Sequence, residues 1–243
     1  MQLAQVVPIL IPALFVTFAI VERIWPARPL PTVKWWRVKG VAFFALSGVL
    51  SAAVPSLYVD FFRAHRLMDL EGLGTIAGIV IGFLAVELAA YAWHRLRHAT
   101  VLWRLAHQMH HSAERLDIYG AVYGHPAELV ATNLVTALVT MLVLGIGPNA
   151  AAVVGVLVVG CAMFQHTNVR TPAWLGYLIQ RPESHSIHHA RGVHAFNYCD
   201  LPLWDIAFGT FRNPERFEPT TGFYDGASRR LGAMLVGRDV SSV

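Results

Sequence analysis

Apolar residues are gathered into five long runs, separated by shorter polar segments. On a window of about 19 residues, the runs cover Leu3–Val21, Val41–Val59, Leu73–Trp93, Leu129–Gly147 and Ala150–Gln165. A helix needs about 20 apolar residues to cross a bilayer, so the pattern predicts an all-α protein with four to five transmembrane or hairpin helices. The last two runs are separated only by GPN, a tight turn that predicts a helical hairpin.

The composition agrees with an integral membrane protein. Hydrophobic residues make up 55% of the 243 residues and charged residues only 14%, and the mean hydropathy is +0.48, unlike soluble domains. The first run has no basic segment before it and no cleavage site, so we interpret it as a retained anchor. Because no linker or low-complexity segment divides the chain, we expect one membrane-embedded domain over residues 1–243, with its stalk over about 3–93 and 129–165.

The distribution of basic residues predicts which side of the membrane each segment faces. The segment between the first two runs carries five Lys or Arg residues, the next carries only Arg63 and Arg66, and the third carries four. Cytoplasmic loops are enriched in basic residues, so we expect the N-terminus outside and the C-terminal region in the cytoplasm. The net charge of +4 lies in these loops, which indicates topology and contact with anionic headgroups rather than nucleic-acid binding.

Histidines are concentrated in three motifs, all on the predicted cytoplasmic side. HRLRH places two histidines four residues apart, and the pattern HxxHH occurs twice, as HQMHH and HSIHH. On a helix these spacings put the imidazoles on one face, close enough to share a metal ion. With 12 histidines in 243 residues, one HxxHH is expected only roughly 0.03 times by chance. The motif residues are His94, His98, His107, His110, His111, His185, His188 and His189.

Eight imidazoles exceed the three or four protein ligands of a single zinc ion. They suit two metal ions that keep open positions for oxygen or a substrate, and His166 in FQHTN, just after the fifth run, is a ninth candidate. Carboxylates are sparse near the motifs, so the site is expected to be a histidine-rich variant of the dimetal sites built from Glu and His. Imidazole binds iron, copper, zinc and nickel, so the ligand type alone leaves the metal open.

Several polar residues near the motifs are candidates for contacts with the outer ring nitrogens of the metal ligands. Some of them also suit other roles: His125 precedes Pro126 and suits a turn, His194 suits packing against aromatic rings, and Asn168 suits a cap or a metal-bound water. The full set of outer candidates is Glu87, Asp117, His125, Asn168, Glu183, His194 and Asp200.

The order of these motifs resembles the fatty acid hydroxylase/sterol desaturase superfamily. The match covers residues 87–211, where HRLRH, HQMHH, FQHTN and HSIHH follow one another, together with HPAE and LWDIAFGTF. The resemblance implies a transmembrane stalk under a cytosolic helical cap, in which the nine histidines bind two iron ions. Some fatty acid 2-hydroxylases have a further histidine four residues after the one matching His166. This chain has Arg170 there, which weakens the case for a tenth ligand and for that branch.

The resemblance also implies the chemistry. Superfamily members use O₂ and electrons from a redox partner to hydroxylate or desaturate lipid C–H bonds, which acid–base groups alone cannot attack. For this chain it implies a membrane-bound non-haem di-iron monooxygenase acting on the hydrocarbon chain of a membrane lipid or fatty acid. The remaining residues have no room for a haem or flavin domain, so the electron donor is expected to be a separate ferredoxin, rubredoxin or cytochrome. Zinc can replace labile iron in purified samples.

Other functions stay open at the level of the sequence. A lipid or sterol desaturase of the same superfamily would use the same ligands. A membrane zinc hydrolase would need only three or four of them and a general base. A metal transporter or a haem-binding protein would place its ligands near mid-membrane on facing helices, whereas these histidines cluster beyond the apolar runs. The substrate, the carbon attacked and the oligomeric state do not follow from the sequence.

Overall fold

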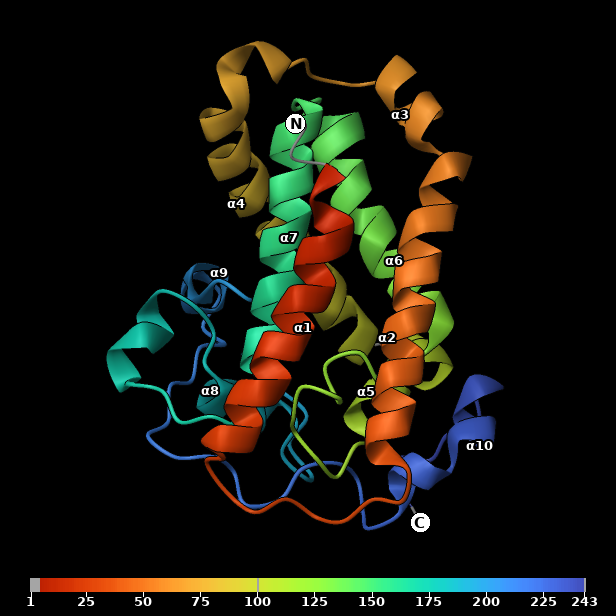
Figure 1. The fold of residues 1–243 in the computed structure, drawn as a ribbon, viewed down its shortest axis with the longest axis vertical. Coiled ribbons are helices and arrows are strands. Elements are labelled where there is room, and N and C mark those ends of the chain that lie inside the picture. The colour runs from red at the N-terminus through yellow and green to blue at the C-terminus, as the bar shows by residue number, and fades with distance from the viewer. Residues whose placement is uncertain (1–4, 100, 243) are drawn as a thin grey trace.

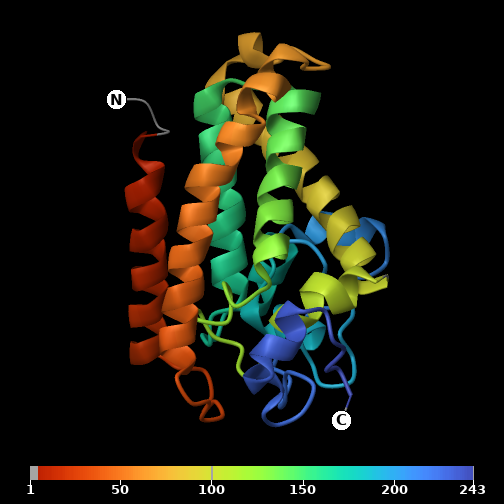
Figure 2. The same ribbon diagram turned by 90° about the vertical axis from the view of Figure 1, so that its right-hand side faces the viewer.

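The computed structural model describes residues 5–99 and 101–242, and its long helices stand side by side as a stalk (Figures 1 and 2). Five helical segments are long and apolar enough to cross a membrane. They are α1 (Val7–Ile24), α2 (Trp36–Ala53) with η2 (Val54–Leu57), η3 (Glu71–Leu73) with α4 (Gly74–Ala99), α6 (Pro126–Ala137) with the π-helix η5 (Leu138–Val143), and α7 (Pro148–Gln165). Each predicted run overlaps one segment, which confirms the all-α membrane fold. Leu3 and Ala4 of the first run lie outside the described residues.

Several helix boundaries differ from the apolar runs. α2 begins at Trp36 rather than Val41, α7 begins at Pro148 within the predicted turn, and α4 continues past Trp93 to Ala99. A hydropathy window ends where the side chains become polar, but the backbone hydrogen bonds of a helix do not depend on side-chain polarity and can extend into the polar segment. The extension of α4 matters for the site, because its last two turns carry His94 and His98.

Helices α4 and α7 approach closely because α4 presents glycines at the contact. Gly78 and Gly82 lie one turn apart, and a Cβ atom on them would stand 2.9 Å from Ala150 Cβ and 2.7 Å from Ile146 Cδ1. Small residues at this spacing let membrane helices pack backbone to backbone. Ile146 and Ala150 belong to a buried apolar cluster with Val154. The contact fixes the direction of α4, whose far end carries His94 and His98.

The outer faces of the stalk expose large apolar side chains. Ile9 on α1 is 72% exposed, Val49 on α2 is 63% exposed and Ile76 on α4 is 81% exposed. In water such surfaces are costly, but in a bilayer the hydrocarbon of the lipid covers them. The five apolar segments and this surface together fit an integral membrane protein.

Short helices and loops form a cap around the lower end of the stalk in Figure 1. The cap contains η4 (Trp103–His107), α5 (Gln108–His111), η6 (Ala173–Tyr177), α8 (Pro182–His188), α9 (Pro202–Ala207), η7 (Ala227–Arg229) and α10 (Leu231–Leu235). Gln108 ties the C-terminal segment to α5, since it donates to Arg238 O at 2.7 Å and accepts from Val240 N at 3.0 Å. At the opposite end, α3 (Val59–Ala64) precedes the loop to α4.

Candidate metal centre

Nine histidines meet where the stalk joins the cap. They come from the end of α4, from η4 and α5, from the residue after α7, and from α8 with the residue that follows it. One nitrogen of each falls into one of two groups, within which the nitrogens lie within 4.8 Å of one another. The five-histidine set is His94, His98, His107, His111 and His188. The four-histidine set is His110, His166, His185 and His189.

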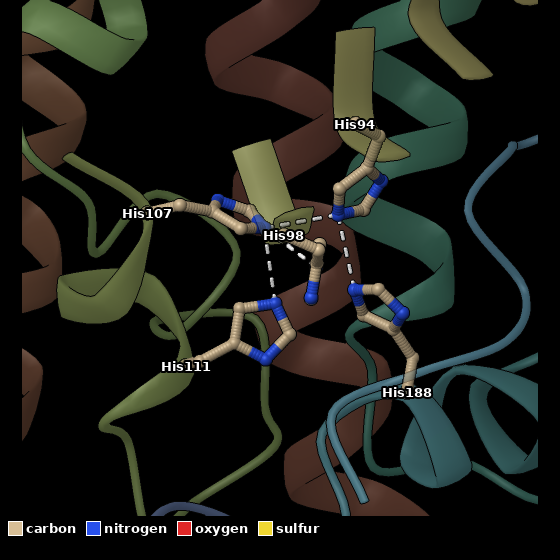
Figure 3. Close-up of side chains that lie close together, drawn as sticks. All are labelled: His94, His98, His107, His111 and His188. Atoms are coloured by element: carbon tan, nitrogen blue, oxygen red, sulfur yellow. Dashed lines mark hydrogen bonds between the residues drawn. The ribbon is translucent and has the colours of Figure 1, made fainter. Parts of the chain in front are cut away.

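In the five-histidine set the side chains point toward a common centre (Figure 3). His107 Nε2 lies 3.0 Å from Nε2 of His94 and of His98, and 3.1 Å from Nε2 of His111. His94 Nε2 lies 3.0 Å from His188 Nε2. Ligand nitrogens at right angles, about 2.1 Å from one ion, lie about 3.0 Å apart, whereas tetrahedral ligands lie about 3.4 Å apart. The spacing and the number of imidazoles therefore favour an ion with more than four ligands.

The four-histidine set has the same spacing. His166 Nε2 lies 3.1 Å from Nε2 of His110 and of His185, and His185 Nε2 lies 3.1 Å from His189 Nε2. The two sets adjoin, since the rings of His111 and His189 are stacked with their centroids 4.2 Å apart. This arrangement suits two neighbouring metal ions, one in each set.

The outer ring nitrogens indicate that the short Nε2–Nε2 contacts are not ordinary hydrogen bonds. His94 Nδ1 lies 2.8 Å from Tyr198 O, and His188 Nδ1 lies 2.7 Å from Phe196 O. A carbonyl oxygen can only accept, so in the neutral rings each Nδ1 carries the proton and each Nε2 carries a lone pair. Two lone pairs that face each other at 3.0 Å repel unless a cation lies among them. The donor set therefore fits a bound metal ion.

The same argument holds in the four-histidine set. Nδ1 of His110 and of His166 face the carbonyls of Tyr123 and Ala162 at 3.2 and 2.6 Å. Burial lowers the pKa of both His110 and His166 to about 4, so these rings are neutral at pH 7 and offer lone pairs to a metal. Burial, and then the charge of neighbouring groups, also lowers the pKa well below its ordinary value in His107, His111, His185, His188 and His189.

A strained segment supplies two of these carbonyls. Phe196 and Asn197 have φ of 67° and 48°, in the left-handed region that non-glycine residues seldom occupy. The Asn197 side chain holds the segment, since it donates to Ser184 O and accepts from Arg212 N, both at 2.8 Å. Such strain is concentrated at functional sites. Here it turns the carbonyls of Phe196 and Tyr198 toward His188 and His94.

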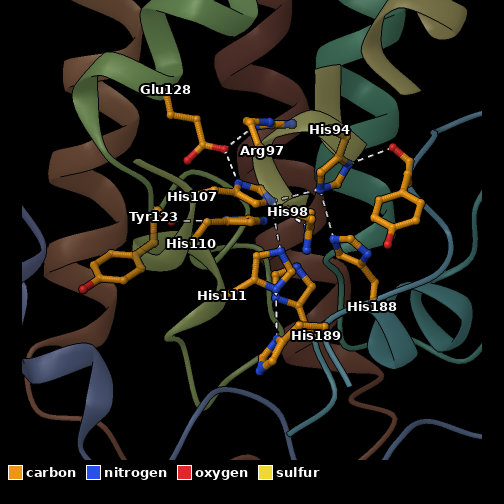
Figure 4. A network of polar contacts seen from close by, with 12 residues as sticks. His94, Arg97, His98, His107, His110, His111, Tyr123, Glu128, His188 and His189 are labelled. Atoms are coloured by element: carbon orange, nitrogen blue, oxygen red, sulfur yellow. Dashed lines mark hydrogen bonds and ion pairs between the residues drawn. The ribbon is translucent and has the colours of Figure 1, made fainter. Parts of the chain in front are cut away.

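Glu128 on α6 binds the outer ring nitrogen of His107, Nδ1, on the side away from the other histidines of the set (Figure 4). Its Oε1 accepts a hydrogen bond from His107 Nδ1 at 2.5 Å and forms a buried ion pair with Arg97. A carboxylate in this position fixes the tautomer that leaves Nε2 free for a metal. Glu128 is absent from the predicted outer residues. HPAE marked its segment as family-like, but no spacing rule connects residue 128 with residue 107.

A chain of side chains connects His185 with Asp200. The Gln180 amide lies 3.3 Å from His185 Nδ1 and contacts Gln165, whose amide lies 2.8 Å from Asp200 Oδ1. Amide oxygens and nitrogens are assigned from their partners. If His185 Nε2 binds a metal, Nδ1 must donate, and Gln180 then presents its oxygen. Burial, and then the charge of Glu87, raises the pKa of Asp200 well above its ordinary value, so a neutral Asp200 can donate to Gln165.

A cavity of about 230 Å³ leads from the histidines into the stalk. Its polar end is lined by His94, His107, His110, His166 and His185, and its apolar walls include Ala90, Leu129, Val158, Val159, Ala162 and Met163. Between α2 and α6 it reaches Ser51, whose side chain is exposed on the stalk. The cavity therefore connects the histidines with the surface that lipid covers.

The predicted outer residues take different places. His194 Nδ1 lies 3.2 Å from His111 Nδ1, and Asp200 connects to His185 through the two glutamines. His125 caps α6, where its side chain accepts from Ala127 N at 3.1 Å. The other four form their hydrogen bonds away from the nine histidines: Glu87, Asp117, Asn168 and Glu183. Arg170 is exposed, so its position adds no tenth ligand.

Comparison with known proteins agrees with this geometry. A family model described as fatty acid hydroxylase matches residues 79–210, which is over half of the chain and includes all nine histidines. Ornithine lipid hydroxylase OlsE of Rhizobium tropici is 29% identical over 57% of this chain and 43% of its own length. Very-long-chain aldehyde decarbonylase GL1-1 of Oryza sativa subsp. indica is 29% identical over 65% of this chain and 26% of its own length. Human alkylglycerol monooxygenase is 29% identical over 68% of this chain and 39% of its own length.

The chain spans less than half the length of each of these three relatives, and no solved structure matches it. The family match contains the whole set of histidine motifs and ends at Thr210, within the LWDIAFGTF piece. The prediction made from those motifs is confirmed: the chain belongs to the fatty acid hydroxylase/sterol desaturase superfamily.

Proposed function

We propose that the chain is an O₂-dependent, membrane-bound di-iron monooxygenase that hydroxylates the hydrocarbon chain of a membrane lipid or fatty acid. The observation that carries the proposal is the pair of histidine sets, whose facing lone pairs fit two cations at the polar end of an apolar cavity. Two of the three relatives described above are named as a lipid hydroxylase and an alkylglycerol monooxygenase.

The residues of this chain have three tasks in such a reaction. The nine histidines would hold two iron ions, which supply the one-electron and O₂ chemistry that an unactivated C–H bond requires. The apolar walls of the cavity, including Val158 and Ala162, hold the hydrocarbon chain and exclude water. Glu128 and the carbonyls of Phe196 and Tyr198 orient the imidazoles.

The opening of the cavity suggests how a lipid enters. Ser51 on α2 marks the open side of the cavity, so a hydrocarbon chain can enter sideways from the bilayer while its headgroup stays at the membrane surface. The cap end carries most of the basic residues, whereas the loop after α2 carries Arg63 and Arg66. We therefore place the cap in the cytoplasm, where a separate ferredoxin, rubredoxin or cytochrome can deliver electrons.

A hydrolase or a transporter suits the geometry less well. The carboxylate nearest the histidines, Glu128, already binds both His107 and Arg97 and is not free to act as a general base. A transporter needs ligands along a path through the membrane. These histidines come instead from the last turns of α4, from the residue after α7 and from η4, α5 and α8, and α5 and α8 lie at one end of the stalk (Figure 1).

Isotope labelling tests the proposal. The chain is expressed in a host grown with iron, its membranes are incubated under ¹⁸O₂ with NADPH and the host's electron carriers, and extracted lipids are analysed by mass spectrometry. We expect lipids that carry one added ¹⁸O atom, and their loss in the variant His98→Ala/His189→Ala, which removes one imidazole from each set. Label that enters from H₂¹⁸O instead of ¹⁸O₂ would contradict the proposal, as would iron-loaded enzyme that forms no hydroxylated lipid.

A further inference from the structure

A second cavity lies at the cap end of α1 and α2, apart from the histidines. It has a volume of about 960 Å³ and lies between the cap-side halves of these two helices, which run side by side in Figure 2. It shares no lining residue with the histidine cavity. A buried apolar cluster separates them, in which Phe15 lines the second cavity and Met163 lines the histidine cavity.

The walls of the second cavity carry uncompensated positive charge. Four arginines line it against two acids, Glu22 and Asp117. Asp117 is already occupied by an ion pair with Arg115 at 2.8 Å and a hydrogen bond from Trp36 Nε1. Glu22 accepts a hydrogen bond from a backbone N–H at 2.7 Å. No described ion pair joins the other three arginines to either acid, so the lining keeps an excess of positive charge.

Three arginines supply this excess charge, and the nearby carboxylate of Glu218 offsets part of the charge of Arg28. Arg23 at the end of α1 and Arg37 at the start of α2 are exposed, and neither side chain forms an ion pair or hydrogen bond among the described contacts. Arg28 is fixed between them, since its guanidinium binds Glu218 O and lies 4.8 Å from the Phe217 ring centroid. Its Nε is buried and has no hydrogen-bond acceptor. Together these groups offer several guanidinium donors to an anion.

Above the arginines the cavity wall is apolar. Phe15, Val16, Ala19 and Ile20 of α1 and Val41 of α2 line it, on helices that expose apolar side chains to the bilayer. A free anion needs no such wall, whereas a phospholipid has a phosphate at the membrane surface and acyl chains that run along it. We propose that this cavity binds an anionic phospholipid, with its phosphate among Arg23, Arg28 and Arg37 and its acyl chains between α1 and α2.

The bound phospholipid would fix α1 on the rest of the stalk. Phe15 is the one buried residue of α1, so the rest of the helix surface stays at least partly exposed. A lipid between α1 and α2 adds contacts to both helices and stabilises the folded protein in proportion to its occupancy. The site is distinct from the proposed hydroxylation site, because no described hydrogen bond or ring contact joins its lining to the histidine sets.

Native mass spectrometry of the purified full chain in neutral detergent tests this proposal. Phosphatidylglycerol and phosphatidylcholine with the same acyl chains are titrated into wild type, into Arg23→Gln/Arg37→Gln, and into the matched control Arg216→Gln/Arg229→Gln, which changes two exposed arginines outside the cavity. We expect wild type and control to retain phosphatidylglycerol in preference to phosphatidylcholine. The cavity variant should bind phosphatidylglycerol about 30-fold more weakly, from two lost charges near the membrane surface.

Further readouts separate the outcomes. Phosphatidylglycerol should raise the unfolding temperature of wild type but not of the cavity variant, and the iron content of both should be equal, since the histidine sets are unchanged. Equal binding of the two lipids, or equal loss in variant and control, would overturn the proposal. Displacement of the lipid by millimolar inorganic phosphate alone would assign the arginines to a free anion and overturn the lipid assignment.

Discussion

Replacing Glu128 by alanine removes the acceptor that holds His107 in place. His107 Nε2 makes three of the four short nitrogen–nitrogen contacts described in the five-histidine set, so its orientation affects most of that set. Outer partners of metal-binding histidines contribute about 10–100-fold to metal affinity, or about 1.4–2.8 kcal/mol. Because His107 is central, we expect a loss near the upper value. Glu128→Ala also leaves the Arg97 guanidinium buried without its partner, which costs about 3–5 kcal/mol of stability.

Anaerobic competition with an Fe(II) chelator measures the affinity, and a thermal melt of the same samples measures the stability. Glu128→Gln keeps an oxygen that can accept from His107 but leaves the charge of Arg97 uncompensated, so we expect a smaller loss of affinity and a clear loss of stability. Asp69→Ala is the matched control, since this carboxylate is exposed and pairs only with Arg66 at the other end of the stalk. Glu128→Ala that melts early but binds iron with wild-type affinity would refute the orienting role.

Three further predictions follow from the site. His166→Ala leaves three imidazoles in its set, so elemental analysis should find iron falling from about two ions toward one per chain; retention of both would contradict the assignment. In metal-free protein, His110 and His166 titrate near pH 4 when folded and near pH 6.5 when unfolded, so the unfolded chain binds more protons between these values. The free energy of unfolding should therefore fall by about 1.4 kcal/mol per pH unit for each histidine as the pH drops from about 6.5 to 4, and thermal melts at pH 7.5, 6 and 5 that coincide would refute it. Ala162→Trp fills the cavity wall and should abolish lipid hydroxylation without loss of iron, whereas an unchanged rate would place the substrate elsewhere.

The spacing of the histidines could be predicted to bring them together, and the structure does so. Each motif lies on or directly beside a helix, and residues three and four positions apart share a face of a helix whatever the tertiary fold. The apolar runs likewise determine how many helices cross the membrane. The division into a five- and a four-histidine set does not follow locally, since His110 and His111 are neighbours in sequence but belong to different sets.

The residues that orient the ligands could not be found in this way. Phe196 and Tyr198 act through backbone carbonyls, which any residue type provides, so the sequence carries no mark of their role. Glu128 reaches His107 from α6, 21 residues further along the chain, and Gln180 reaches His185 from the turn before α8, at a spacing of five that follows no helical face. Proximity in sequence to a motif was a poor guide, since Glu183 lies two residues before His185 yet binds Thr171. Such contacts depend on how the elements pack in three dimensions, which cannot be predicted from the spacing of residues within one motif.

The iron content per chain after anaerobic purification from iron-supplemented cells tests the central claim most directly. It is compared with His110→Ala/His188→Ala, which removes one imidazole from each set. We expect close to two irons per chain in the wild type and their loss in the variant. One zinc per chain, or a metal content that the double substitution leaves unchanged, would contradict the two-iron centre and the oxygenase function built on it.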